Sequence, residues 1–192
     1  MPDKSLSLPL RRLLGLSEES SEFLLEPVTI GPAPIAGAGD FETETLRRIW
    51  LFLEQKRGDR TMLSRADIDP ADLLQVLPRV GLTELHQSPP RYRMRLAGTH
   101  WTNVLGFDPT GMWLDQWPLD PHRQLFEALL DVTVATKRAH YARRQALIEG
   151  GMMLFEAMVL PLSPDGETIN MLLSMGTPWR SGRTRATLKG KA

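Results

Sequence analysis

The order of strand-like and helix-like segments constrains the fold of this 192-residue chain more than any other feature. Two strand-like runs come first, a helical stretch follows, and three more strand-like runs come after it. Short turn-rich links separate most neighbouring runs, which favours antiparallel pairing. The predicted strands are 79–86, 91–98, 139–148, 152–162 and 167–176, and the longest helix of the middle stretch is predicted over about 121–136.

Apolar and basic side chains alternate in the second strand-like run, 91–98, which indicates that one face of this strand is buried. Tyr92, Met94 and Leu96 alternate with Arg91, Arg93 and Arg95, and this period of two predicts that one face of the strand lies in the core and the other in water. Five such strands around a helical stretch can form one antiparallel sheet with helices covering one of its faces. The sequence therefore predicts an α+β fold.

An amphipathic helix is predicted ahead of the sheet, from Phe41 to Lys56. Its apolar residues recur at spacings of three and four, with Asp40 as the expected N-cap and Gly58 as the end of the helix. A second short helix is predicted at 69–74. We expect the first helix to flank the domain and to offer its apolar stripe as a dimer interface, formed by Leu46, Ile49, Trp50 and Leu53.

The segments outside this region differ in composition. Residues 1–40 are interpreted as a leader followed by an extended linker, because 27–40 are rich in Pro, Gly and Ala and have no period. The domain is predicted over 41–176. Residues 177–192 carry several basic and no acidic side chains, and we expect them to form a disordered tail.

Overall composition excludes several classes of function. There are 23 Lys and Arg against 23 Asp and Glu, so nothing draws the chain globally to nucleic acid or to membranes. The chain has no cysteine, which excludes disulfides, thiolate chemistry and Cys-ligated zinc. Neither a signal peptide nor a membrane span is predicted, and we expect a cytoplasmic protein.

Residues for catalysis or metal binding do not form a recognisable motif. The four histidines fit no metal-ligand spacing, so no metal and no cofactor is expected; haem ligation by His100 or His122 is a minor alternative to a surface or capping role. We find no nucleophile motif and expect no enzymatic activity. Glu156, in a predicted strand, is expected to pair across the sheet with an arginine such as Arg143 or Arg144.

Aromatic and methionine side chains provide the strongest indication of a binding site. Aromatic rings on helices that cover a sheet can line a ligand cavity, and methionines make adaptable apolar walls, although both can simply fill a core. The candidate ligand-binding residues are Trp101, Leu105, Phe107, Trp113, Trp117, Phe126, Met153 and Met171.

Three segments resemble one family: LRRIWLFLEQKRGDRTMLSRADIDPADLLQVLPRV, YRMRLAGTHWTNVLGFDPTGMWLDQW and FEAMVLPLSPDGETINMLLSMG. Together they are similar to the PAS-like domains found as stand-alone, uncharacterised bacterial proteins, over about residues 44–176. The resemblance implies a five-stranded sheet in the order 2-1-5-4-3 with a pocket under the central helices. Gly106 and Gly111 look like the glycines that break these helices. The cysteine that flavin photosensors of this family need is absent.

Three hypotheses for function are compatible with these features. The first is a non-enzymatic sensory or regulatory module that binds a small apolar or aromatic ligand and signals by contact, either as a homodimer or through a separate regulatory protein. The second is a ligand-free interaction or dimerisation module. The third, more remote, is a small α+β cone enzyme, which would need polar acid and base groups inside its cup.

Overall fold

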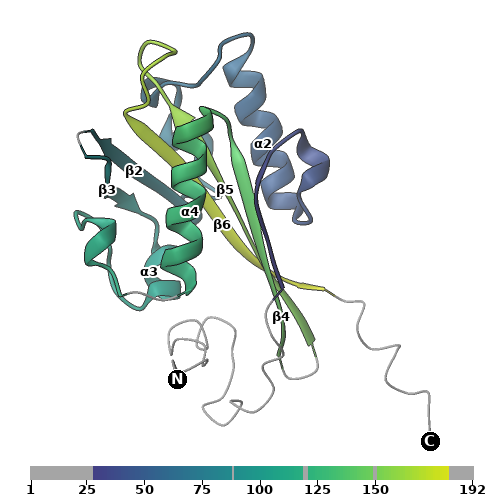
Figure 1. Ribbon diagram of the computed structural model, residues 1–192. Coiled ribbons are helices and arrows are strands. Elements are labelled where there is room, and N and C mark those ends of the chain that lie inside the picture. The colour runs from purple at the N-terminus through teal and green to yellow at the C-terminus, as the bar shows by residue number, and fades with distance from the viewer. Residues whose placement is uncertain (1–27, 88, 119–120, 149–150, 182–192) are drawn as a thin grey trace, which may run out of the picture.

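A six-stranded antiparallel sheet is the centre of the computed structural model, which describes residues 28–87, 89–118, 121–148 and 151–181 (Figure 1). Every neighbouring pair of strands runs antiparallel, as the short links predicted. The strands are β1 (Val28–Pro34), β2 (Val80–His86), β3 (Arg91–Ala97), β4 (His140–Ile148), β5 (Gly151–Leu162) and β6 (Met171–Ser181).

The strand order confirms the expected topology and adds one strand to it. The sheet reads β1-β4-β5-β6-β2-β3. Counted from β2 as the first strand, the last five positions follow the order 2-1-5-4-3 in reverse, as the resemblance implied. The sixth strand, β1, pairs with β4 outside this set.

Strand β1 comes from the segment that was expected to be a linker. Its register on β4 shifts between Ile30 and Ala33, where Gly31 has a positive φ of 93°. Beyond the strand, the Ile35 N–H still donates to the Ala139 carbonyl at 3.0 Å. Backbone hydrogen bonds to the β4 edge therefore order a segment whose side chains show no period. At the other end of the domain, β6 runs to Ser181, into the predicted tail, and residues 182–192 lie outside the described residues.

The helices agree with the predicted segments to within a few residues, and the one at 121–136 agrees at both ends. The segment 69–74 is helical as expected, but as a 3₁₀ turn in which the Asp69 side chain accepts from the Ala71 N–H at 2.8 Å. The α-helices are α2 (Glu44–Arg57), α3 (Thr99–Leu105) and α4 (Pro121–Thr136); the 3₁₀ turns are η2 (Ala38–Asp40), η3 (Arg65–Asp67), η4 (Pro70–Leu73), η5 (Leu77–Arg79) and η6 (Leu114–Gln116).

Helices α2 and α4 pack on opposite faces of the sheet (Figure 1). Alternation along β5 shows this, because Met158 and Leu160 join the hydrophobic core under α2 while Val159 joins the core under α4. The central helices cover one face, as expected. The flanking helix α2 covers the other, so the sheet separates two cores.

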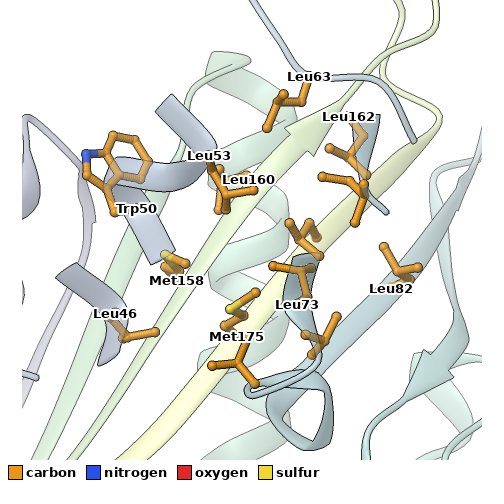
Figure 2. Close-up of a cluster of buried hydrophobic side chains, with 14 of the residues drawn as sticks. Leu46, Trp50, Leu53, Leu63, Leu73, Leu82, Met158, Leu160, Leu162 and Met175 are labelled. Carbon is orange, nitrogen blue, oxygen red and sulfur yellow. The ribbon is translucent and has the colours of Figure 1, made fainter. Parts of the chain in front are cut away.

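The core under α2 is built by the apolar stripe of that helix (Figure 2). Leu46, Trp50 and Leu53 are 1%, 7% and 0% exposed and contact side chains from β5 and β6. Full burial of side chains of this size stabilises a fold by about 1.5–3 kcal/mol each. Gly58 ends the helix as predicted, with a φ of 57° and its N–H donating to the Glu54 carbonyl.

The start of α2 differs from the prediction. Asp40 does not cap it, because the helix begins four residues later, at Glu44. The Asp40 carboxylate instead accepts hydrogen bonds from the N–H groups of Ala36 and Gly37, at 2.7 and 3.0 Å, and closes the η2 turn.

Candidate functional site

Four aromatic side chains meet on the face of the sheet that α4 covers. Phe126 lies between the two indoles, with ring centroids 5.0 Å from Trp101 and 6.0 Å from Trp117. The rings of Trp117 and Phe126 are nearly parallel, and Phe107 meets Trp117 edge-on at 5.9 Å. These geometries are the favourable ones for aromatic pairs. We call Trp101, Phe107, Trp117 and Phe126 the aromatic cluster.

The two tryptophans of the aromatic cluster differ in how their N–H groups are satisfied. Trp101 Nε1 donates to the carbonyl of Arg79 at 2.9 Å. Trp117 is only 4% exposed, and its Nε1 is buried without a hydrogen-bond partner among the described residues. A buried donor without an acceptor is unusual, because it loses its bond to water and gains nothing.

Glycines and polar contacts hold the segments that carry the aromatic cluster. Gly106 ends α3 in the left-handed conformation, with a φ of 77°, and Gly111 follows with a φ of 83°. Gly106 thus ends a helix, as the resemblance implied, and both positions have the positive φ that glycine adopts readily. The Trp117 carbonyl accepts from Arg123 Nη1 at 2.9 Å. The Tyr92 hydroxyl donates to Asp131 on α4 at 2.6 Å, and burial together with this carboxylate raises the pKa of Tyr92.

The other predicted ligand-binding residues, Leu105, Trp113, Met153 and Met171, are not members of the aromatic cluster. Leu105 is half-buried and packs against the same core. Trp113 lies apart, with its ring 4.1 Å from the Arg91 guanidinium and 4.8 Å from the His86 ring. Met171 packs on the opposite face, under α2. The backbone of Met153 lies in β5, but its side chain is outside the described part of the chain.

The predicted interface residues lie mainly inside the chain. Leu46, Trp50 and Leu53 are buried against the sheet, so they are not available to a second subunit while α2 stays packed. Ile49 is half-buried and lines a groove of about 660 Å³ between α2 and the η4 region. An interface on this helix would therefore use Ile49 and its neighbours on the groove side.

Histidine and acidic residues of the described ranges form no metal site. No group of three or more such side chains is placed to hold a metal ion there. His100, on α3, has a buried Nε2 without a hydrogen-bond partner. Burial, and then the charge of Arg79, lowers the pKa of His100. The His122 side chain lies outside the described part of the chain.

None of the described helices is long and apolar enough to cross a membrane.

Glu156 has two sets of contacts, and the sequence predicted only one of them. Its carboxylate is fully buried and lies opposite Arg143 in the β4–β5 register, with Arg143 Nε 3.8 Å from Oε1, which confirms the predicted pairing. The carboxylate also accepts from the N–H of Glu42 at 3.0 Å and from Thr43, the N-cap residue of α2. One charged side chain in an otherwise apolar strand was the available signal.

Arg143 joins this buried carboxylate to the surface. Its guanidinium contacts Glu42 at 3.1 Å and the Tyr141 hydroxyl at 3.3 Å. Burial works against the charged form, but the hydrogen bond to Tyr141 and the charges of Glu156 and Glu42 outweigh it and raise the pKa of Arg143. Arg143 therefore stays charged, and it balances Glu156 on the α2 face of the sheet.

Comparison with known proteins agrees with this architecture. A family model described as a PAS domain matches residues 41–175, and the chain belongs to that family. PAS domains are sensory and interaction modules and are typically non-enzymatic. Among curated proteins, none matches the chain.

Proposed function

We propose that this protein is a non-enzymatic sensory module whose aromatic cluster binds a small apolar or aromatic ligand with one hydrogen-bond acceptor. The observation that carries the proposal is the buried Nε1 of Trp117, which has no partner among the described residues. Aromatic walls around one placed polar group are the usual composition of a small-molecule site. An acceptor on the ligand would satisfy this donor, and the rings of Phe107 and Phe126 would contact its apolar body.

The signal would leave through β5 and α2. Ala157 packs with the core on the α4 face, and its neighbour Glu156 points to the other face and bonds the start of α2. A ligand that shifts β5 therefore alters the hydrogen bonds that hold α2. The neighbouring residues of a single strand would connect the two faces of the sheet without any further element.

Native mass spectrometry of the full chain tests the ligand, followed by denaturing extraction of anything released. The expected result is one small molecule per subunit, which is lost in Trp117→Phe but retained in Trp101→Phe, whose N–H serves the Arg79 carbonyl instead. A protein that carries no small molecule, and whose melting temperature no apolar or aromatic compound raises, would refute the proposal.

A protein-interaction module is the second candidate, favoured by exposed apolar side chains near α2. Leu51 is 59% exposed and Leu74 is 66% exposed, and Leu74 lines the 660 Å³ groove together with Ile49 and Phe52. Exposed apolar patches of this kind mark interaction sites. A homodimer or a separate regulatory protein would cover the groove through these residues.

Sedimentation equilibrium distinguishes this candidate. Leu74→Glu should break a dimer that uses the groove, whereas Leu96→Glu, a matched change at a 40% exposed leucine on β3, should not. If the wild-type chain stays monomeric at all concentrations, the homodimer is excluded, and only a separate regulatory protein could cover the groove. Equal dimerisation of both variants would exclude the groove as the dimer interface.

A further inference from the structure

A second groove, of about 370 Å³, lies between α2 and the edge where β1 pairs with β4. It is on the face of the sheet opposite the aromatic cluster, so a ligand there would be independent of the one proposed above. Ile35 from the end of β1, Trp50 from α2 and Leu160 from β5 contribute apolar walls. Its volume is in the lower part of the range of small-molecule sites, about 300–1,000 Å³.

Two hydrogen-bond donors in this groove have no acceptor in the described part of the chain. One is Trp50 Nε1; Figure 2 shows this nitrogen on the side of the ring away from Leu53 and Leu160. The other is the side chain of Arg138, an exposed residue of the groove lining between α4 and β4, whose backbone bonds Thr136 and His140.

The other charges around the groove already neutralise one another. Arg57 donates to both carboxylate oxygens of Glu54, at 3.0 and 2.7 Å, and also to the Arg60 carbonyl. This pairing raises the pKa of Arg57, chiefly through the hydrogen bond to Glu54. The bidentate geometry engages both oxygens of the Glu54 carboxylate. Among the described residues, the groove is therefore left with one unpaired positive charge and one unpaired N–H.

We propose that this groove binds a small carboxylate with a compact apolar body. The planar fork of a guanidinium matches a carboxylate, and the second donor can come from the indole. Trp50, Leu63 and Leu160 line the groove, and their accessible surface would contact the apolar body. Phosphate fits less well, because its additional charge and oxygens would face these apolar walls without donors.

Indole N–H signals in ¹⁵N-correlated NMR spectra of the full chain provide the test. The chain has five tryptophans, and Trp50→Phe identifies the signal of residue 50 by its loss. The probes are acetate, isobutyrate and phenylacetate, titrated at constant pH and ionic strength, with isobutyramide as the uncharged match. A saturable shift of the Trp50 signal by isobutyrate or phenylacetate is expected, with weaker binding of acetate and of isobutyramide.

Arg138→Gln should weaken this binding by roughly tenfold or more, as for loss of a charge-assisted pair. Arg48→Gln is the matched control, because Arg48 is an exposed arginine that lines the other groove. Spectral dispersion reports that both variants are folded. The proposal is overturned if none of the three carboxylates shifts the Trp50 signal saturably, if both variants bind equally, or if inorganic phosphate binds as tightly as phenylacetate.

Discussion

Thr43 and Glu156 are joined by two hydrogen bonds that reach the same carboxylate oxygen, from the Thr43 N–H at 3.0 Å and from its hydroxyl at 2.9 Å. A residue at the centre of β5 thus holds the two residues that precede the first turn of α2, and Thr43 itself makes no side-chain cap. A negative charge at a helix N-terminus also interacts favourably with the helix dipole. The contact ties α2 to the sheet at one defined point.

Glu156→Ala should lower the free energy of unfolding by about 3–5 kcal/mol, because it leaves two backbone N–H groups without their acceptor and removes the buried opposite charge of the half-buried Arg143. Urea unfolding followed by tryptophan fluorescence measures this. Glu156→Gln keeps an acceptor oxygen and should cost less. Thr43→Ser, which retains the hydroxyl, is the control, and its stability should stay close to that of the wild type. Equal stability of Glu156→Ala and wild type would contradict the role given to this contact.

The two tryptophans of the aromatic cluster provide a matched pair of variants. Trp101→Phe removes the hydrogen bond to the Arg79 carbonyl, whereas Trp117→Phe removes a donor that has no partner among the described residues. We expect Trp101→Phe to be less stable than Trp117→Phe by about 1 kcal/mol. Buried area alone predicts the opposite order, because Trp117 is the more buried ring. Urea midpoints of the two variants decide between these accounts.

His100 should make stability depend on pH. Its pKa in the fold is lowered, so the unfolded chain takes up the proton first, near the ordinary value of about 6.5. Its stabilising contribution is therefore present above that pH and is lost as pH falls through the folded pKa. Unfolding in urea at roughly pH 8 and 5.5 should show a smaller loss on acidification for His100→Gln than for the wild type. An identical loss in both proteins would exclude His100 as the source.

Gly98 permits the close approach of the chain at the start of α3. A Cβ at this position would lie closer than 3.0 Å to the carbonyl oxygens of Leu77 and Pro78, and backbone atoms cannot easily move aside. Gly98→Ala should therefore destabilise the fold by about 1–3 kcal/mol or more. Gly39→Ala is the control, since a Cβ there meets no atom within 4 Å. Thermal unfolding of the two variants should differ clearly, and similar melting temperatures would show that the segment can shift.

Much of the fold followed from period and turn chemistry in the sequence. The range of α4, the hairpins of the sheet and the helix stop at Gly58 are encoded by local side-chain patterns. Strand β1 could not be predicted in the same way, because its pairing depends on backbone groups and on the free edge of β4. The face of the sheet that α2 covers could not be predicted either, since an apolar stripe shows that a helix packs but not on which surface.

The sequence indicated which kinds of side chain could form the candidate site, but it indicated less well on which face of the sheet each of them lies. The four members of the aromatic cluster all come from helical segments and turns after β3, which brings them to one face. Met171 was misplaced because strand parity decides the face. Its neighbour Leu172 faces α4, whereas Met171 itself faces α2. Glu156 needed the three-dimensional contact with Thr43, which is more than a hundred residues away in the sequence.

The outer strands of the sheet limit how this protein can assemble. On one side β1 contains Pro32 and Pro34, which have no N–H to donate, and on the other side β3 presents Arg91, Arg93 and Arg95 to solvent. Proline and charged side chains on an edge strand both disfavour the addition of another strand. We therefore expect growth of the sheet from molecule to molecule to be opposed at both ends, and fibre formation in concentrated solutions to be disfavoured.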